Sequence, residues 1–295
     1  MSDAWPALPF DDWRATCDTL HMWTQVIGKV RLAQAPHVNH WWQVPLYVGA
    51  RGLSTTSIPF RERSFEIEFD FVDHVLAIRT CEGDARTVKL EPKSVEAFYA
   101  EVMAALEALG LPINIWTMPQ EFDDPIPFDK DTGHASYERE PVERFWRVLR
   151  SVDAVLKEFR SGFIGKASPV HFFWGSFDLC VTRFSGRRAP PMPEADKVTQ
   201  EGYSHEVSSV GWWPGDPTTP YPAFYAYAAP EPAGFGNARV LPAAAFYDKD
   251  AGQFRLKYDD VRTAPAPRQV LLDFCRTTYE AAATLATWNR GELER

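Results

Sequence analysis

Two apolar segments of this chain, one in each half, open with a histidine followed by two large rings. Residues 38–54 read VNHWWQVPLYVGARGLS, with His40 at the head, and residues 170–185 read VHFFWGSFDLCVTRFS, with His171 at the head. Alternate positions counted from each histidine are largely apolar, a pattern that favours a strand with one buried face. Such a repeated opening indicates a fold built from two similar units.

The same kinds of element surround both segments. Before the first, a helix is indicated by apolar residues at steps of three or four, namely Trp13, Cys17, Leu20, Trp23, Ile27 and Val30. Asp11 or Asp12 can cap this helix and Pro36 ends it. A second long helix is predicted from Pro141, before the second segment.

A meander and a closing helix follow each segment. SFEIEFDF alternates strictly between polar and apolar residues, which predicts a half-buried strand, and VLAIRT and RTVKL continue it as antiparallel strands. In the second half, AAAFYDKDAGQFRLKY predicts a hairpin that turns at residues 250–252. Ser94 caps the helix that closes the first half, and a helix after Pro267 closes the second.

Repeated units that pack together keep the order of their elements even when their sequences diverge. We therefore predict an α+β protein of two pseudo-repeated units, each of helix, antiparallel meander and helix, with a shared or adjoining sheet. The first unit spans residues 1–117 and the second spans 141–295. A proline-rich acidic connector at 118–140 has no period and joins them. A proline-rich insertion at 186–243 is expected to cover a cleft between the units.

Composition excludes several classes of partner. The 295 residues are 45% hydrophobic and can bury a large core, while the net charge of −9 opposes binding to nucleic acid. No apolar run approaches the roughly 18 to 20 residues of a spanning helix, and no basic leader precedes an apolar core, so no membrane role is expected. Four widely spaced cysteines with apolar neighbours predict buried thiols in a reducing cytoplasm, and hence a cytoplasmic location.

Four blocks also resemble a known family. They are NHWWQVPLYVGARGLSTTSIPF, PVHFFWGSFDLCVTRFSGRRAP, YSHEVSSVGWWPG and FYAYAAPEP, in this order along the chain. Together they are similar to the signature blocks of an uncharacterised bacterial domain-of-unknown-function family. The resemblance implies one architecture over nearly the whole chain, and it implies no activity.

Catalytic motifs are weak throughout. HEVSS at His205 lacks the second histidine of a zincin helix, WGSFD around Ser176 has one glycine where a nucleophile elbow has two, and no glycine-rich phosphate loop follows a strand. No motif identifies a cofactor or a metal site, and no feature specifies an oligomeric state.

Position along the predicted strands supplies the candidate catalytic residues, His40, His171 and His205. His40 and His171 share strand parity with core residues, so both should face inward and approach each other if the units pack about a pseudo-two-fold axis. They could be hydrogen-bonded core histidines, groups that bind a ligand or transfer a proton, or, with His205, ligands of a metal. Asp178, on the other parity, should face away from His171.

The candidate ligand-binding residues are Trp42, Arg183, Trp212 and Tyr225. Arg183 has the parity of His171 and could pair with a carboxylate or hold an anion. The function hypothesis is binding of a small, partly apolar ligand that can carry an anionic group, in the cleft between the units, with acid or base chemistry by a histidine. The alternative is a non-catalytic interaction protein that uses the aromatic insertion as its contact surface.

Overall fold

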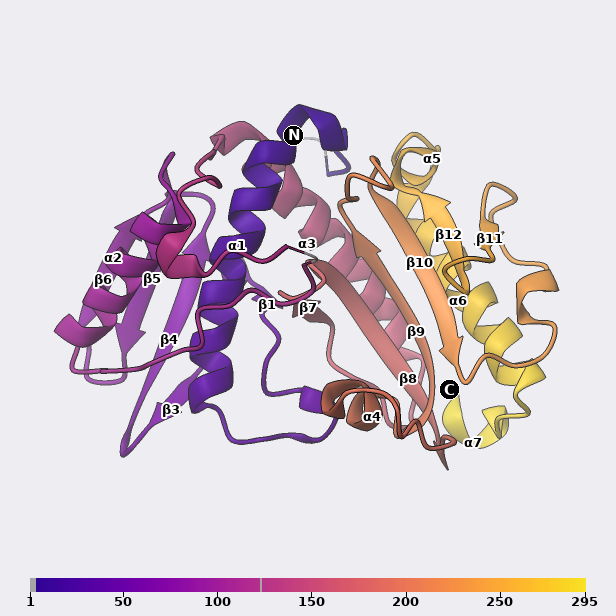
Figure 1. Cartoon of the computed structure of the whole chain (residues 1–295). Coiled ribbons are helices and arrows are strands. Elements are labelled where there is room, and N and C mark those ends of the chain that lie inside the picture. Colours follow the sequence, from indigo (N-terminus) through magenta and orange to yellow (C-terminus); the bar gives the residue numbers. More distant parts are fainter. Residues whose placement is uncertain (1–3, 123) are drawn as a thin grey trace.

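The structure, a computed structural model, describes residues 4–122 and 124–295 and is an α+β fold with two antiparallel sheets. Figure 1 shows one sheet in each half of the chain, with the long helix α1 (Phe10–Gln34) between the sheets and the long helix α3 (Arg139–Ser161) behind the second one. The predicted fold class is confirmed.

The first sheet has the order β1-β2-β4-β5-β6, and β3 pairs with β4 beside this path. Its strands are β1 (Tyr47–Val48), β2 (Gly52–Ser54), β3 (Ile58–Phe60), β4 (Arg63–Asp70), β5 (Val75–Thr80) and β6 (Ala85–Lys89). Helix α2 (Val95–Ala108) closes this half, and the short 3-10 helices η1 (Asn39–Trp41) and η2 (Phe128–Lys130) lie in the connections.

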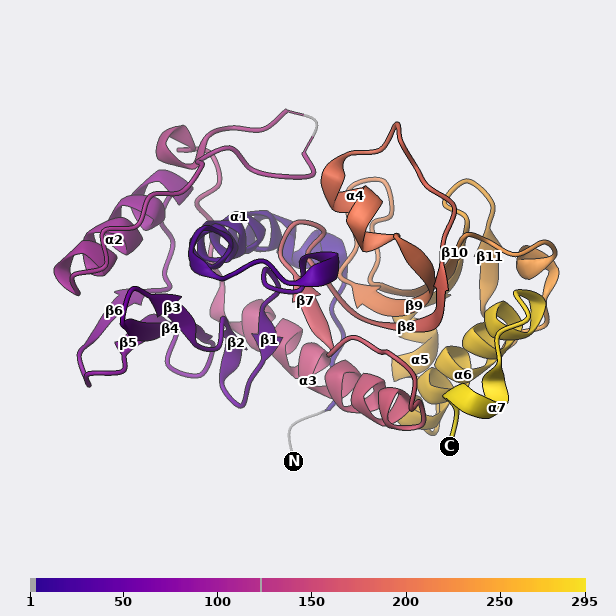
Figure 2. The same cartoon turned by 90° about the horizontal axis from the view of Figure 1, so that it is seen from below.

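The second sheet has the order β11-β12-β10-β9-β8-β7. Its strands are β7 (His171–Phe173), β8 (Asp178–Arg188), β9 (His205–Trp213), β10 (Ala223–Ala229), β11 (Phe246–Asp248) and β12 (Gln253–Lys257). The helices of this half after α3 are α4 (Lys197–Gly202), η3 (Phe235–Asn237), α5 (Tyr258–Arg262), α6 (Pro267–Leu285) and α7 (Arg290–Leu293). Figure 2 shows α3 and α6 on one side of this sheet and α4 on the other.

Local sequence signals place several boundaries correctly. The Ser94 side chain accepts a hydrogen bond from the Ala97 backbone N–H at 3.1 Å, as its capping role requires. Pro267 begins α6, and Gly252, with a φ of +63°, lies in the turn between β11 and β12. Helix α1 begins one residue before the predicted caps, at Phe10.

The two sheets adjoin through one antiparallel bridge. Leu46 and Phe172 exchange both backbone hydrogen bonds, with N···O distances of 2.8 and 2.9 Å. The strands on either side, β1 and β7, are the edge strands that face each other. The predicted sharing or adjoining of the sheets is therefore seen, while the pseudo-repeat of the two units stays a prediction.

Both histidine-headed segments are less regular than predicted. His40 and Trp42 do not lie on a strand, because residues 39–41 form η1 and the first strand begins at Tyr47. Residues 170–185 are not one strand either. They form the hairpin β7–β8, whose turn contains Gly175 and Phe177, the latter with a φ of +56°. The apolar run conceals this turn because two of its residues, Trp174 and Phe177, are themselves buried.

The proline-rich segment at 186–243 is more than a cover. It contains α4, β9 and β10, and the latter two are inner strands of the second sheet. The expectation of buried thiols holds for Cys17, Cys180 and Cys275, whereas Cys81 is exposed. In the described part of the chain, no helix is long and apolar enough to span a membrane.

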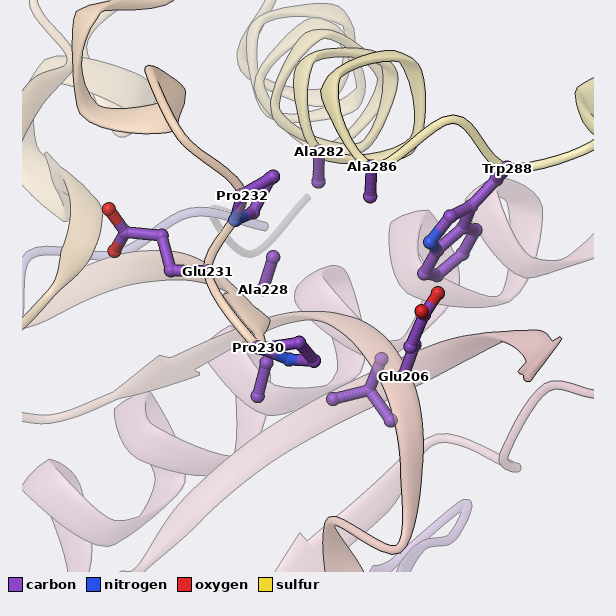
Figure 3. Close-up of a pocket in the computed structure, with 10 residues that line it drawn as sticks. Glu206, Ala228, Pro230, Glu231, Pro232, Ala282, Ala286 and Trp288 are labelled. Atoms are coloured by element: carbon purple, nitrogen blue, oxygen red, sulfur yellow. The ribbon is translucent and has the colours of Figure 1, made fainter. Parts of the chain in front are cut away.

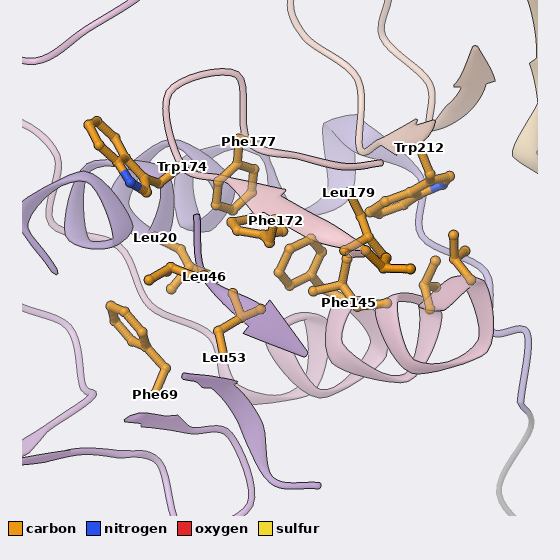
Figure 4. Close-up of a cluster of buried hydrophobic side chains, with 14 of the residues drawn as sticks. Leu20, Leu46, Leu53, Phe69, Phe145, Phe172, Trp174, Phe177, Leu179 and Trp212 are labelled. Carbon is orange, nitrogen blue, oxygen red and sulfur yellow. The ribbon is translucent and has the colours of Figure 1, made fainter. Parts of the chain in front are cut away.

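A single cluster of buried apolar side chains runs through both halves. Phe145 of α3 lies at its centre, with ring centroids 5.2 Å from Trp13 of α1, 5.3 Å from Phe177 and 6.0 Å from Trp212 (Figure 4). Helices α3 and α6 cover one face of the second sheet, and α4 lies on the other face (Figure 2).

Candidate functional site

Strand register decides which side chains share the face opposite α3 and α6. His171 pairs with Cys180, and Cys180 pairs with Gly211, so residues alternating from these positions point the same way. We name this surface the polar face of the second sheet; it carries His171, Asp178, Cys180, Thr182, Phe184, Ser209 and Tyr225.

Three predicted histidines and Trp42 meet at the edge of the polar face, where the two halves join. Ring centroids are 5.8 Å apart for His40 and His205, 5.3 Å for His40 and Trp42, and 5.7 Å for Trp42 and His171. His40 is 7% exposed and His171 is 1% exposed, while Trp42 and His205 are half-buried. The sequence predicts that His40 and His171 approach each other from two strands; here both rings pack against Trp42, and His40 does so from η1.

Lys166, which the sequence analysis did not select, completes this group. Its ammonium donates a hydrogen bond to Nε2 of His40 at 2.7 Å and lies over the rings of Trp42 and Phe184, at 5.1 and 4.9 Å. Nδ1 of His40 donates to the carbonyl oxygen of Glu201 at 3.0 Å, so the free electron pair of a neutral His40 ring lies on Nε2. Nothing in the local sequence distinguishes Lys166 from an ordinary loop lysine.

The pKa values of the basic groups in this cluster are all lowered. Burial lowers the pKa of His40, and the nearby charges of Lys166 and His205 lower it further. Two hydrogen bonds to backbone carbonyl groups raise this pKa and only partly offset the shift. Burial lowers the pKa of His205, and Lys166 and Arg188 add to that effect. Burial also lowers the pKa of Lys166. These surroundings therefore make positive charge less favourable on each of the three groups than it is in water.

A second pair of basic groups lies beside the first. Burial lowers the pKa of His171 to about 3, with smaller contributions from Arg31 and Arg160. The guanidinium of Arg31 donates to the carbonyl oxygen of Pro45 and lies 5.1 Å from the ring of Tyr47, whose centroid is 5.6 Å from that of His171. Nε2 of His171 and Nε of Arg31 are buried and have no hydrogen-bond partner within the described structure.

We name the whole group the basic seam, and it consists of Lys166, His40, His205, His171 and Arg31, set around Trp42 and Tyr47. The carboxylate of Glu201 lies at its edge, where it bonds to Nε2 of His37 at 2.9 Å and accepts from the His40 backbone N–H at 3.3 Å. Across the residues that the structure describes, no ion pair joins Lys166, Arg31 or Arg188 to a carboxylate.

Two predicted ligand-binding residues, Arg183 and Trp212, lie on the face of the second sheet that α3 and α6 cover. Arg183 does not share a face with His171, because the hairpin turn pairs His171 with Cys180 and reverses the parity. Its guanidinium donates to the Phe159 carbonyl oxygen and lies over the rings of Phe159 and Tyr279, at 3.5 and 4.3 Å. Trp212 is fully buried. Both are core residues here.

Tyr225 lies on the polar face, in a second cluster. It donates a hydrogen bond to Asp178, which also accepts one from Ser176 at 2.5 Å. The prediction that Asp178 faces away from His171 is wrong, because Asp178 pairs with Phe173 across the hairpin. Burial raises the pKa of Asp178, and its two hydroxyl partners only partly oppose that shift.

Metal ligation finds no support in this geometry. Over the described ranges, no three histidine, cysteine, aspartate or glutamate side chains are placed to hold a metal ion. The arrangement of His40, His171 and His205 around Trp42 instead offers imidazole rings, one ammonium and an aromatic surface.

Comparisons with known proteins add a family and no activity. Neither the curated proteins nor the solved structures contain a match to this chain. A model described as a family of unknown function, DUF5996, matches residues 5–295. Because this match covers nearly the entire chain, the protein belongs to the DUF5996 family of unknown function.

Proposed function

We propose that this protein binds a small anionic ligand with an apolar or aromatic part at the basic seam. The observation that carries the proposal is the convergence of Lys166, His40 and His205, whose pKa values are all lowered, without an ion pair from Lys166 to a carboxylate in the described structure. Positive charge on these groups costs more free energy than it does in water, and an anion placed among them would offset that cost.

The ring of Trp42 supports the apolar part of the ligand. It lies between the imidazoles of His40 and His171, and the Lys166 ammonium lies 5.1 Å from its centroid. Aromatic side chains with a charged neighbour commonly line small-molecule sites, because the ring packs against the ligand body while the charge fixes its orientation.

Acid or base chemistry at the seam would involve His40. Its Nδ1–H is held by the Glu201 carbonyl oxygen, which leaves Nε2 as the atom that accepts or returns a proton. Lys166, which donates to Nε2, would release this atom when a ligand anion attracts the ammonium. Binding is the part of the function that the geometry supports best.

The interaction-protein alternative is less well supported. It requires aromatic rings of residues 186–243 on the surface. The large apolar side chains exposed in that range are Met192, Val198 and Leu241, and none of these three is aromatic. The net charge of −9 argues against a polynucleotide as the anion. Buried free thiols at Cys17, Cys180 and Cys275 support a reducing, cytoplasmic location.

Calorimetric titration with phenyl phosphate, inorganic phosphate and phenol tests the proposal. Phenyl phosphate should bind more tightly than either of the other two, because only it satisfies both the cations and Trp42. Replacing Lys166 with Met should weaken its binding roughly tenfold. Added salt should weaken it further. Lys249→Met, an exposed lysine in the β11–β12 turn, serves as the matched control.

Proton uptake gives a sharper measure. An anion raises the pKa values of His40 and His205, so binding near neutral pH should take up protons, seen as a heat that depends on the ionisation enthalpy of the buffer. His40→Gln should reduce this uptake. Equal binding of phenyl phosphate and phenol, or an affinity that Lys166→Met leaves unchanged, would refute the proposal.

A further inference from the structure

A pocket of about 210 Å³ lies between the ends of β9 and β10 and the C-terminal part of α6. Figure 3 shows its lining, which includes Glu206, Ala228, Pro230, Pro232, Ala282 and Trp288. Glu206 follows His205 on β9, and adjacent strand residues point to opposite sides of a sheet. The pocket is therefore separate from the basic seam and lies on the side of the sheet that α6 covers.

Small and apolar residues create the space. Ala282 of α6 and Ala286, the residue that follows this helix, face the alanines and prolines at the end of β10. Larger residues at these positions would fill the gap. Apolar cavities of about 150 Å³ are known to hold a benzene-sized molecule, so this volume admits a compact ring.

Trp288 supplies a hydrogen-bond donor without an acceptor. Trp288 is 7% exposed, and its Nε1 is buried with no hydrogen-bond partner in the described structure. The residue is fixed in place by its backbone N–H, which donates to the Ala283 carbonyl oxygen at 2.8 Å, and by the ring of Tyr279 at 6.0 Å. In Figure 3 the indole nitrogen lies on the edge of the ring that faces the pocket. Buried N–H groups are usually satisfied. Of the six indole nitrogens without a partner in the described residues, that of Trp288 belongs to a residue that lines this pocket, where a ligand could supply the acceptor.

Glu206 supplies an acceptor on the same side. Its Oε2 accepts two hydrogen bonds from Arg187, at 2.9 and 2.7 Å, and Arg187 also donates to the Thr287 carbonyl oxygen at 3.2 Å. The ion pair balances the charge of the carboxylate, while Oε1 keeps its capacity to accept a hydrogen bond. A ligand here is therefore neutral, with an acceptor for Trp288 and a donor for Glu206.

We propose that this pocket binds a small neutral cyclic amide. The C=O and N–H of a cyclic amide lie on one edge of the molecule, which matches a donor and an acceptor on one side of the pocket, and its carbon ring matches the alanine and proline walls. The site is independent of the anion site proposed above, and either can fail without the other.

The test uses 2-piperidone, with cyclohexanone as the matched compound that keeps the carbonyl and lacks the N–H. The readout is the indole N–H resonance of Trp288 in ¹⁵N-labelled full-length protein, assigned by its disappearance in Trp288→Phe. 2-Piperidone should move this resonance saturably and bind several-fold more tightly than cyclohexanone, because only the amide can donate to Glu206.

Two variants separate binding from folding. Ala282→Leu and Ala286→Leu each fill the pocket from the α6 side and should abolish the response, while Ala244→Leu, on an exposed loop, should leave it intact. Since Ala286 is half-buried, its variant can be used if Ala282→Leu does not fold. A Trp288 resonance that 2-piperidone leaves unmoved, or a response that both pocket-filling variants retain, would overturn the proposal and assign the space to ordered water.

Discussion

At the scale of single residues, the seam histidines differ in what their ring nitrogens contact. His40 has a backbone acceptor on one nitrogen and the Lys166 ammonium on the other. His171 is almost fully buried, and its Nε2 has no partner in the described structure. Without an acceptor for a second proton, and with Arg31 nearby, the ring of His171 stays neutral when folded.

This difference predicts a pH dependence of stability. The pKa of His171 is about 3 in the folded protein against 6.5 for an ordinary histidine, so below pH 6.5 the unfolded chain takes up a proton that the folded chain does not. The contribution of His171 to the free energy of unfolding is therefore complete above pH 6.5 and falls as the pH drops toward 3. The slope is about 1.4 kcal/mol per pH unit.

Urea unfolding of wild type and His171→Leu, from about pH 7 to about pH 5, measures this slope as a difference between the two proteins. The variant should show the flatter profile, because leucine binds no proton. Phe173→Leu, a neighbouring ring without a titrating group, should keep the wild-type slope. Parallel profiles for wild type and His171→Leu would mean that His171 is protonated in the fold.

At the scale of elements, the approach of α1 to the β7–β8 turn depends on one glycine. Trp174, in that turn, lies against Gly28 in the middle of α1 and donates its indole N–H to the Val44 carbonyl oxygen at 2.9 Å. A Cβ atom added to Gly28 would lie 2.2 Å from the indole ring. The helix therefore needs a glycine here, although glycine weakens a helix interior.

Replacing Gly28 with Ala should consequently destabilise the protein by about 1–3 kcal/mol, the usual cost of overpacking, although alanine is the better helix former. Thermal or urea unfolding measures the change. Gly291→Ala, where no atom lies closer than 3.9 Å to the added Cβ, is the control. In a Trp174→Leu background the cost of Gly28→Ala should shrink, and an unchanged cost would show that the clash is not with Trp174.

At the scale of the whole molecule, one apolar core and one backbone bridge join the two sheets. The core includes Leu46, Leu53 and Phe69 from the first half and Phe145, Phe172 and Trp212 from the second (Figure 4). Leu46 and Phe172, which form the bridge, are both fully buried. Neither half can unfold without exposing side chains of the other.

We therefore expect a single unfolding transition in scanning calorimetry, with a calorimetric enthalpy close to the van't Hoff enthalpy. Leu46→Ala should lower the midpoint of that one transition, with a loss of about 2–5 kcal/mol, whereas Val72→Ala, at an exposed position, should change little. Two transitions, only one of which responds to Leu46→Ala, would show that the halves are independent domains.

The sequence by itself determined the elements whose signals are local. The alternation of Phe65, Ile67 and Phe69 identified β4, Ser94 and Pro267 marked helix starts, and the turn at 250–252 identified a hairpin. Periodicity, capping and turn chemistry act within a few residues, so they can be read without knowing the fold. The parity argument placed His40 and His171 on strands that face each other, whereas His40 lies on η1.

Only the tertiary structure decided which side chains share a surface. The turn between β7 and β8 placed Asp178 on the same face as His171 and turned Arg183 into the core. The pairing register between strands, and not the parity along one apolar run, sets the face of a strand residue. Lys166 and Trp288 became candidates in the same way. Each depends on contacts between residues far apart in the chain, and no local pattern records such contacts.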